Sequence, residues 1–332
     1  MSKQQSEPSV VAIGGGSGLS NMLRGLKLRT SKLTAIVTMA DDGGSSGRLR
    51  DELGMPPPGD VRNCLSALAN TEPAMEQLLS YRFSEGLLRG QSLGNLFLAA
   101  LTDLSGSFYE AVRRLSEVLA ITGRVLPVTT ADVRLLAFFD DGTKVLGESK
   151  ITAHKKKTDQ RISQVSLIPE KPPALGDSLA AISEADLILL GPGSLYTSII
   201  PNLLTEGIVS AIESAKALRI YVLNVTTQDG ETEHYTASDH VRALFAHSGG
   251  KLFDYCLANS APLPAHVAAS YRKEGACQTA VDIPALEKLG VETVLRPMLD
   301  CSGGLARHDS KRLALEIMSL YREKSPTRIF NT

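Results

Sequence analysis

The sequence predicts an α/β fold built on a Rossmann-like, doubly wound and mostly parallel sheet, with a small antiparallel excursion. Val10 to Ile13 form a β-prone run that ends at three glycines and leads into a helical pattern through Lys27. The segment Asp186 to Leu190 is a second apolar run, as is typical of a strand buried on both faces. Strands and helices then alternate along the chain, which favours a parallel sheet.

The remaining elements follow from apolar periodicity. A second strand covers Leu33 to Met39, a glycine-serine-arginine loop follows it, and helical patterns occupy most of Val61 to Ala120. In the second half the predicted elements are a helix at 209–217, a strand at 219–225, a helix at 238–248, a strand at 254–258 and a helix at 310–323.

Residues 10–325 are predicted to form a single domain, with tails at 1–9 and 326–332. The antiparallel excursion lies within it at about residues 126–168. It contains a predicted hairpin of Arg134 to Phe139 with Lys144 to Gly147, and Ile162 to Ile168 as a further strand. We interpret the basic run at 154–157 as a solvated hairpin tip.

The composition excludes several classes of protein. Of the 332 residues 43% are apolar and 21% charged, and the net charge is −1, which gives no electrostatic reason to expect nucleic acid or an anionic membrane as a partner. The four cysteines are scattered, and no apolar run approaches the roughly 18 residues that span a bilayer. The start of the chain is polar and resembles no signal peptide. We expect a cytoplasmic protein without a membrane span.

The first candidate site is the glycine turn Gly14, Gly15, Gly16, Ser17 and Gly18. A glycine turn between a strand and a helix presents backbone N–H groups and a helix N-terminus to a phosphate. The turn lacks the GK[ST] of a Walker loop, and its GxGxG pattern departs from the GxGxxG of dinucleotide folds. The sequence therefore predicts a nucleotide-phosphate site but not a conventional NAD dehydrogenase.

The second candidate site is the loop with Asp41, Asp42 and Gly43 at the end of the second strand. Such carboxylates can accept ribose hydroxyls, or they can hold Mg²⁺, which prefers oxygen ligands. They can also simply cap a helix in a surface loop. These three alternatives stay open from the sequence.

Three arginines near this loop, Arg48, Arg50 and Arg62, are candidate phosphate ligands because a guanidinium offers paired donors to an anion. Surface ion pairs with neighbouring carboxylates are the alternative. Asp60 is predicted to cap the helix that begins at Val61.

The third candidate site is a second glycine turn, with Gly191, Gly193 and Ser194, at the carboxyl end of another strand. Asn224 and Thr227 leave the carboxyl end of the next strand. Ligands of open α/β sheets lie outside these strand ends, where the strand order reverses. Two such turns suit one elongated ligand with a diphosphate, or two ligands that meet.

Several long segments resemble the YvcK-type gluconeogenesis factor family, the bacterial branch of the CofD-like superfamily whose namesake is 2-phospho-L-lactate transferase. They are AIGGGSGLSNMLRGLK, VTMADDGGSSGRLRDELGMPPPGDVRNCLSALA, SLGNLFLAAL, GPGSLYTSIIPNLL, TTQDGETEHYTASDHV and ARHDSKRLA. The resemblance implies a Rossmann-like fold, a cytoplasmic location and binding of a UDP-sugar, with UDP-N-acetylglucosamine favoured. It also implies a role in cell shape and wall synthesis during growth on gluconeogenic carbon sources.

The resemblance also implies site residues. Tyr271 and Arg307 match positions associated with nucleotide-sugar binding, and Asn95 lies in a matching segment. A tyrosine can stack on a uracil face and an arginine can hold a diphosphate. Ser310 is either a phosphorylatable hydroxyl or a helix cap.

We therefore expect a UDP-sugar-binding regulator without a catalytic role. We also expect it to form a homo-oligomer and to have cell-wall synthesis or regulatory proteins as partners. The histidines show no zinc-ligand spacing and no serine lies in a nucleophile elbow, which argues against hydrolytic chemistry. The alternative is a Mg²⁺-dependent transferase that moves a phosphorylated group from a nucleoside diphosphate donor. The GGSSGRLRDELGMPPPGD segment departs from the transferase version of the motif, which argues against phospholactate transfer.

Overall fold

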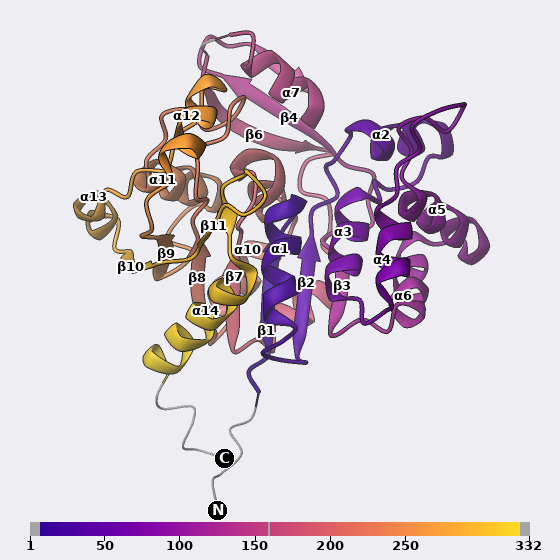
Figure 1. The fold of residues 1–332 in the computed structure, drawn as a ribbon, viewed down its shortest axis with the longest axis horizontal. Helices are drawn as coiled ribbons and strands as arrows, with labels where there is room; N and C mark the ends of the chain where they lie inside the picture. Colours follow the sequence, from indigo (N-terminus) through magenta and orange to yellow (C-terminus); the bar gives the residue numbers. More distant parts are fainter. Residues whose placement is uncertain (1–6, 159, 326–332) are drawn as a thin grey trace, which may run out of the picture.

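The computed structural model describes residues 7–158 and 160–325 and shows a central parallel sheet with helices on both faces (Figure 1). Across this sheet the strand order is β10 (Glu292–Arg296), β9 (Tyr255–Asn259), β8 (Leu218–Val222), β7 (Leu187–Leu190), β1 (Val10–Gly14), β2 (Leu33–Val37) and β3 (Arg124–Pro127). All neighbouring strands pair in parallel. The predicted doubly wound fold is confirmed.

The strand order reverses beside β1. Val10 pairs with Leu33 of β2 on one side and with Leu187 of β7 on the other. Strands β2 and β3 therefore lie on one side of β1, and strands β7 to β10 lie on the other. Every residue of β1, β2 and β7 is buried, which explains their continuous apolar sequence.

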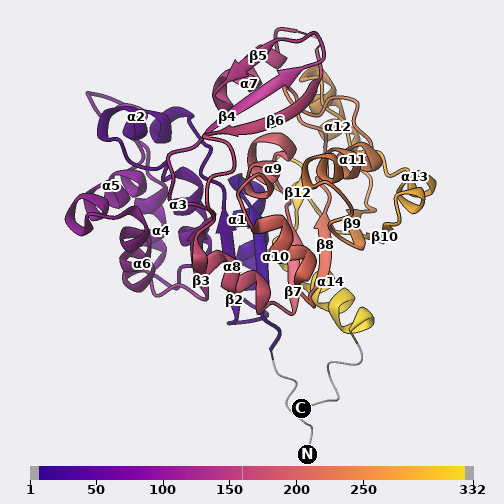
Figure 2. The ribbon, with the colours of Figure 1, turned by 180° about the vertical axis from the view of Figure 1, so that it is seen from behind.

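Helices cover both faces of the sheet. In Figure 1 the helices α1, α3 and α14 lie in front of the sheet, and Figure 2, which shows the molecule from behind, shows α8 and α10 on the other face. The helices of the first half are α1 (Gly16–Leu26), α2 (Gly44–Leu53), α3 (Gly59–Leu68), α4 (Pro73–Ser80), α5 (Leu93–Ser105), α6 (Phe108–Val118) and α7 (Glu148–Lys155). Those of the second half are α8 (Gly176–Ser183), a π-helix (Leu195–Ile199), α9 (Ile200–Leu203), α10 (Ile208–Ser214), α11 (Ala237–Ser248), α12 (Ala265–Lys273), α13 (Ile283–Lys288) and α14 (Ser310–Lys324).

A three-stranded antiparallel sheet lies beyond the carboxyl ends of the main strands, at the top of Figures 1 and 2. It consists of β5 (Lys144–Leu146), β4 (Arg134–Phe139) and β6 (Ile162–Ile168). The predicted hairpin and third strand are therefore confirmed. A two-stranded ribbon, β11 (Leu299–Asp300) with β12 (Arg307–His308), precedes α14.

Three predictions about helices, strands and turns were wrong. The basic run at 154–157 is not a hairpin tip: it ends helix α7, and Lys155 is buried in an ion pair with Glu233. The segment after Gly43 is not a loop but helix α2, which ends at Gly54 in the left-handed conformation. Strand β3 begins at Arg124 and belongs to the parallel sheet rather than to the antiparallel excursion, and β10 was not predicted.

The chain ends fall partly outside the described residues. Residues 1–6 and 326–332 of the predicted tails are among the residues that the structure does not describe. Ser9, in the predicted N-terminal tail, donates its N–H to the Asp186 carboxylate just before β7. Across the described residues no helix is both long and apolar enough to cross a membrane.

Candidate functional site

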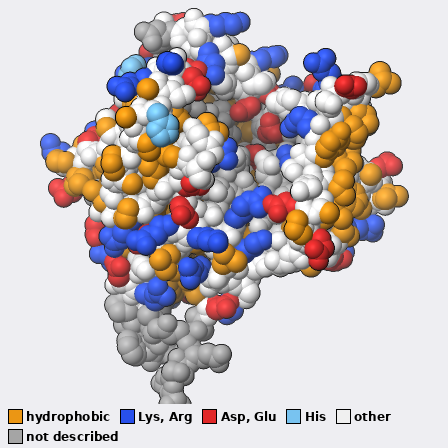
Figure 3. Space-filling model, viewed as in Figure 1, with side chains coloured by type: hydrophobic (Ala, Val, Ile, Leu, Met, Phe, Trp, Pro, Cys, Tyr) orange, Lys and Arg blue, Asp and Glu red, His pale blue; other side chains and the backbone are white. Residues whose placement is uncertain are grey.

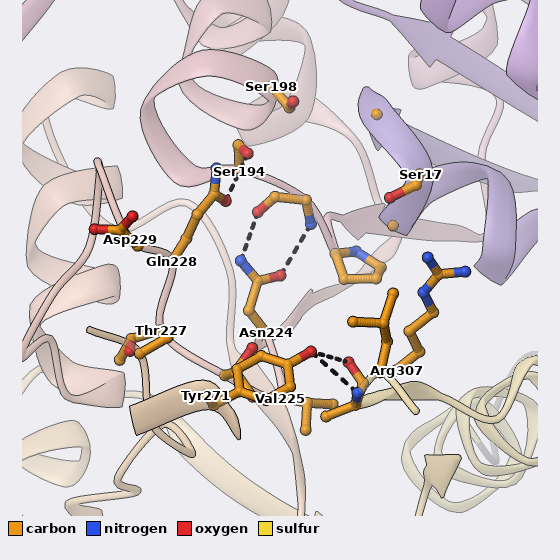
Figure 4. A pocket seen from close by; sticks show the side chains of 18 of the residues that line it. Ser17, Ser194, Ser198, Asn224, Val225, Thr227, Gln228, Asp229, Tyr271 and Arg307 are labelled. Carbon is orange, nitrogen blue, oxygen red and sulfur yellow. Dashed lines mark hydrogen bonds between the residues drawn. The ribbon is translucent and has the colours of Figure 1, made fainter. Parts of the chain in front are cut away.

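A cavity of about 650 Å³ opens at the carboxyl ends of β1, β7 and β8 (Figure 4). In the view of Figure 3 the surface is hollowed between the two halves of the molecule, and charged side chains surround the hollow. The cavity is lined by Gly16, Ser17, Gly18, Asn21, Thr152, Lys156, Pro192, Gly193, Ser194, Ser198, Asn224, Val225, Thr226, Thr227, Gln228, Asp229, Tyr271, Glu274, Ala276, Leu305, Ala306, Arg307 and His308.

The first glycine turn brings the N-terminus of α1 to this cavity. Gly15 is the N-cap residue and has no side chain to cap the helix, and the Asp60 carboxylate accepts a hydrogen bond from the Gly16 N–H. Gly16 has φ +67°, a left-handed conformation that favours glycine. A Cβ atom at Gly18 would lie 2.7 Å from the Pro192 carbonyl oxygen, so glycine allows the two turns to touch. The following amides, those of Ser17 and Gly18, also lie beside the cavity, and helix N-terminal amides are suited to an anion.

The second glycine turn is held by the loop that follows β8. The Gly193 N–H donates to Asn224 Oδ1 at 3.0 Å, and Asn224 Nδ2 donates to the Gly193 carbonyl oxygen at 2.7 Å. The Ser194 hydroxyl donates to Gln228 Oε1 at 2.7 Å (Figure 4). The side chains of Asn224 and Ser194 therefore shape the cavity, because their hydrogen-bonding groups are already engaged by the neighbouring loop.

A buried carboxylate fixes the segment beyond this turn. Glu231 accepts the N–H groups of Leu195, Tyr196 and Thr197 at 3.0 to 3.1 Å. Burial raises the pKa of Glu231 to about 7, although these hydrogen bonds favour the ionised form. Glu231 does not line the cavity itself but fixes the segment that follows the second glycine turn.

Two other predicted residues lie at the carboxyl end of the chain. The Tyr271 hydroxyl accepts the Ala306 N–H at 3.0 Å, which fixes the segment that carries Arg307 (Figure 4). The Arg307 side chain makes no hydrogen bond or ion pair with any described residue, and it is exposed. Next to it, burial lowers the pKa of His308 to about 4, so this histidine is neutral at pH 7. Arg307 is therefore a cation available to a ligand.

The polar and apolar parts of the cavity are separated. Ser17 and Ser198 face it beside the glycine turn, and their hydroxyls have no partner among the described side chains and backbone (Figure 4). At the other end, Tyr271 packs with Val225 in a small apolar cluster. The Thr227 hydroxyl hydrogen-bonds the backbone of Cys277, so it contributes shape rather than a free donor.

The remaining predicted residues surround a second, smaller cavity of about 290 Å³. It is lined by Asp41, Gly43, Gly44, Ser45, Ser46, Gly59, Asp60, Arg62, Asn63, Arg82 and Asn95. The glycine turn separates the two cavities, because Gly16 lines the first and a Cβ atom at Gly15 would lie 2.6 Å from Asp60 Oδ2. Asp60 lies in the first turn of α3 and is not its N-cap, so the predicted capping role is wrong.

The second cavity places two carboxylates near each other. Burial, followed by the charge of Asp41, raises the pKa of Asp60 to about 6. Burial also raises the pKa of Asp41. Glu148, from α7, has its pKa raised to about 7 by burial and then by the charges of Asp41 and Asp42. Arg62 partly offsets these charges, and its Nε donates to Asn95 Oδ1 at 3.1 Å.

Asp41 and Asp42 diverge from each other, which does not favour a metal ion held by both. Asp41 Oδ1 accepts the Gly43 N–H at 2.9 Å, whereas Asp42 Oδ1 accepts the Ser149 N–H at 2.8 Å in the first turn of α7. Asp42 thus caps α7 and lines neither cavity. Among the described residues, no group of three or more His, Cys, Asp and Glu side chains is arranged to hold a metal ion.

Several other residues predicted to bind a ligand make structural contacts instead. Arg50 is buried and donates to the Val133 carbonyl oxygen and the Asp132 carboxylate, and Arg48 donates to the Arg89 carbonyl oxygen. Neither arginine lines the first cavity. Gly14 lies in β1, and Gly191 has a left-handed φ of +74°. Neither residue lines the cavity.

The alternative role of Ser310 as a helix cap was wrong. Asp309 caps α14, and its carboxylate accepts the N–H groups of Lys311 and Arg312. Phosphorylation of Ser310 stays a prediction.

Sequence reasoning missed the part of the wall that comes from α7. Thr152 and Lys156 line the first cavity although they belong to the antiparallel layer. The basic run gave no indication of this, because only the docking of α7 onto the loop after β8 brings Lys156 to the cavity.

The family follows from comparison with known proteins. Residues 10–299 match the family described as 2-phospho-L-lactate transferase CofD. The chain belongs to the CofD family.

Within the CofD family the similar curated proteins are gluconeogenesis factors. That of Bacillus subtilis strain 168 is 46% identical over 318 residues, which cover 96% of this chain and 99% of the relative. That of Halalkalibacterium halodurans is 46% identical over 311 residues, covering 93% and 95%. A crystal structure of protein BH3568 from Bacillus halodurans has a TM-score of 0.91 and 45% identity, covering 94% of this chain and all of that one (100%). The predicted resemblance to gluconeogenesis factors is confirmed.

Proposed function

We propose that this protein is a cytoplasmic regulator that binds a UDP-sugar, with UDP-N-acetylglucosamine as the favoured ligand. Its role would be in cell shape and wall synthesis during growth on gluconeogenic carbon sources. The names of its relatives support the link to gluconeogenesis. The predicted homo-oligomer and partner proteins remain part of this proposal.

One observation carries the proposal: a single cavity joins the N-terminus of helix α1 to a tyrosine and an exposed arginine. Its volume of about 650 Å³ lies within the range of about 300 to 1,000 Å³ typical of small-molecule sites. The amides of Ser17 and Gly18 would receive the diphosphate, with Arg307 close by, because Asn21 of α1 donates to the carbonyl oxygen of the adjoining His308. The apolar end around Tyr271 and Val225 suits the uracil ring.

Isothermal titration calorimetry tests this function directly. The full chain is titrated with UDP-N-acetylglucosamine, UDP and uridine, and the nucleotide is then recovered and analysed. We expect binding of the intact nucleotide sugar, weaker binding of UDP and the weakest binding of uridine. Absence of binding by all three would overturn the proposal.

Replacing Arg307 tests the contact of the cavity with the phosphates. We expect Arg307→Ala to weaken UDP-N-acetylglucosamine binding about tenfold or more, because a charge-assisted hydrogen bond contributes about 1.5 to 3 kcal/mol. Arg272→Ala is the matched control, since Arg272 is exposed on α12 and does not line the cavity. Equal affinity in Arg307→Ala and the parent would remove Arg307 from the site.

The second cavity favours a transferase as the alternative function. It adjoins the glycine turn, and Asp60 with its raised pKa is suited to accept a proton from an acceptor hydroxyl. The donor would be a nucleoside diphosphate carrying a phosphorylated group. The divergence of Asp41 and Asp42 does not support a metal held by that pair. Turnover of the nucleotide on addition of an acceptor would favour the transferase, and recovery of intact ligand favours the regulator.

A further inference from the structure

We propose that Lys156 is a second phosphate-binding cation of the main cavity, and that ligand binding moves its ammonium group from Asp229 to the diphosphate. This inference rests on the proposed function, because it assumes an anionic ligand at the glycine turn. Lys156 follows the last residue of α7, Lys155, and lines the cavity together with Thr152. It comes from the antiparallel layer, opposite the helix N-terminus of α1.

Two adjacent lysines of α7 have different surroundings. Lys155 Nζ lies 3.0 Å from Glu233 Oε2, with only 7% of the lysine side chain and 15% of the glutamate side chain exposed. Lys156 Nζ lies 2.9 Å from Asp229 Oδ2, with 50% and 36% exposed. An enclosed pair is costly to break, whereas a half-exposed pair contributes little and exchanges readily. Lys155 therefore anchors α7, and Lys156 remains able to change its partner.

The charges around the cavity support such an exchange. The described lining residues include two cationic side chains, Lys156 and Arg307, and two carboxylates, Asp229 and Glu274. His308 adds no positive charge near pH 7 because burial lowers its pKa to about 4. The lining is thus electrically balanced without a ligand. A diphosphate adds negative charge, so it favours a conformation in which Lys156 faces the phosphates instead of Asp229.

Close packing places the lysine stem before any ligand binds. A Cβ atom at Gly230 would lie 3.0 Å from Cγ and Cε of Lys156 and 3.0 Å from Cγ2 of Thr152. The stem therefore lies against the loop after β8, with its ammonium group at the cavity wall. Ordering a lysine side chain has an entropic cost, so a stem that is already in place favours binding.

When Lys156 turns to the diphosphate, the Asp229 carboxylate becomes able to bind another part of the ligand. Asp229 lies next to Gln228 (Figure 4). Its Oδ1 is 3.6 Å from where a Gly275 Cβ atom would lie. A carboxylate released from an ion pair is a strong acceptor for sugar or ribose hydroxyls. The pair would thus supply one cation to the diphosphate and one acceptor to the hydroxyl-bearing part of the ligand.

Two variants of the same pair separate this proposal from a purely structural ion pair. We expect Lys156→Ala to weaken binding of both inorganic pyrophosphate and UDP-N-acetylglucosamine by about tenfold, as measured by calorimetry. Asp229→Asn should instead strengthen pyrophosphate binding several-fold, because it removes the competing carboxylate. Lys157→Ala is the control, since Lys157 is exposed and does not line the cavity.

The possible outcomes of this experiment distinguish failure of this inference from failure of the proposed function. If both variants weaken pyrophosphate binding alike, or if neither changes it, the pair is structural and the inference is overturned. If the parent binds pyrophosphate in a Lys156-dependent manner but not UDP-N-acetylglucosamine, the cation role holds and the proposed function fails. If the parent binds neither, both fail. Melting temperatures within about two degrees of the parent would show that the variants are folded.

Discussion

Gly18 is a position at which one added methyl group should disturb the site. Its Cβ atom would lie 2.7 Å from the Pro192 carbonyl oxygen and 2.9 Å from its carbonyl carbon. We expect Gly18→Ala to lower the free energy of unfolding by about 1 to 3 kcal/mol and to weaken nucleotide binding, because the two glycine turns must separate. Chemical denaturation and calorimetry measure both. Gly250→Ala is the control, since nothing lies within 4 Å of its Cβ position; a similar loss there would contradict the argument.

Asp60 should make the stability of the protein depend on pH. Its pKa rises from 3.8 to about 6 in the fold, so its contribution to stability is fully present below pH 3.8 and is lost as the pH rises through 6. Above that pH the ionised carboxyl lowers the free energy of unfolding by at most about 3 kcal/mol. We expect Asp60→Asn to raise the melting temperature at pH 8 and to change it much less at pH 5.

A matched variant checks the origin of this effect. Asp103 is exposed and lies outside both cavities. Asp103→Asn should therefore leave the difference between pH 5 and pH 8 as it is in the parent. If Asp60→Asn destabilised the protein equally at both values of pH, the hydrogen bond to the Gly16 N–H would matter more than the charge.

At the scale of elements, a buried carboxylate joins the loop after β8 to the π-helix after β7. Glu231 satisfies three N–H groups at the start of Leu195–Ile199. In Glu231→Gln one oxygen is replaced by an amide that donates, so at least one of these N–H groups loses its acceptor. We expect a loss of about 1.5 to 3 kcal/mol in the free energy of unfolding and weaker nucleotide binding.

Urea denaturation and calorimetry measure the two effects. Glu213→Gln, at an exposed position on α10, is the control. Parental nucleotide affinity in Glu231→Gln, despite reduced stability, would show that the π-helix segment does not shape the binding wall.

The antiparallel layer is the second element that shapes the site. Its helix α7 contacts the loop after β2 through Asp42, which accepts the Ser149 N–H, and contacts the loop after β8 through Lys155 and Lys156. One short helix thus connects the surroundings of both cavities. This explains why Asp42, a predicted ligand, acts as a cap.

At the scale of the whole molecule, the reversal of strand order between β1 and β7 places the two glycine turns side by side. The cavity takes residues from Gly16 to His308, so a ligand there stabilises the folded chain as a whole. We expect UDP-N-acetylglucosamine at a hundred times its Kd to add about 2.7 kcal/mol to the free energy of unfolding.

Differential scanning fluorimetry measures this gain as a rise in melting temperature. Arg307→Ala, at the same ligand concentration, should show a smaller rise because its site is less occupied. A rise that is equal in the parent and in Arg307→Ala would indicate that the ligand binds elsewhere on the protein.

Much of the fold was predictable because its strands are buried on both faces. Val10 to Ile13 and Leu187 to Leu190 are apolar throughout, and glycines end both runs. Helix α2 was missed although Gly54 follows it as a C-cap, because the glycines and serines at its start suggested a loop. Strand β10 has a mixed burial pattern, and its sequence therefore gave a weak signal.

The sequence by itself determined the parallel sheet, the two glycine turns and the family, because each of these depends on residues that are neighbours along the chain. Only the tertiary structure decided that Asp41 and Asp60 line a separate cavity, that Asp42 caps α7 and that Lys156 reaches the main cavity. The physical reason is that these roles depend on how distant elements pack. A side chain's partners across the fold are set by that packing and leave no periodic trace in the residues around it.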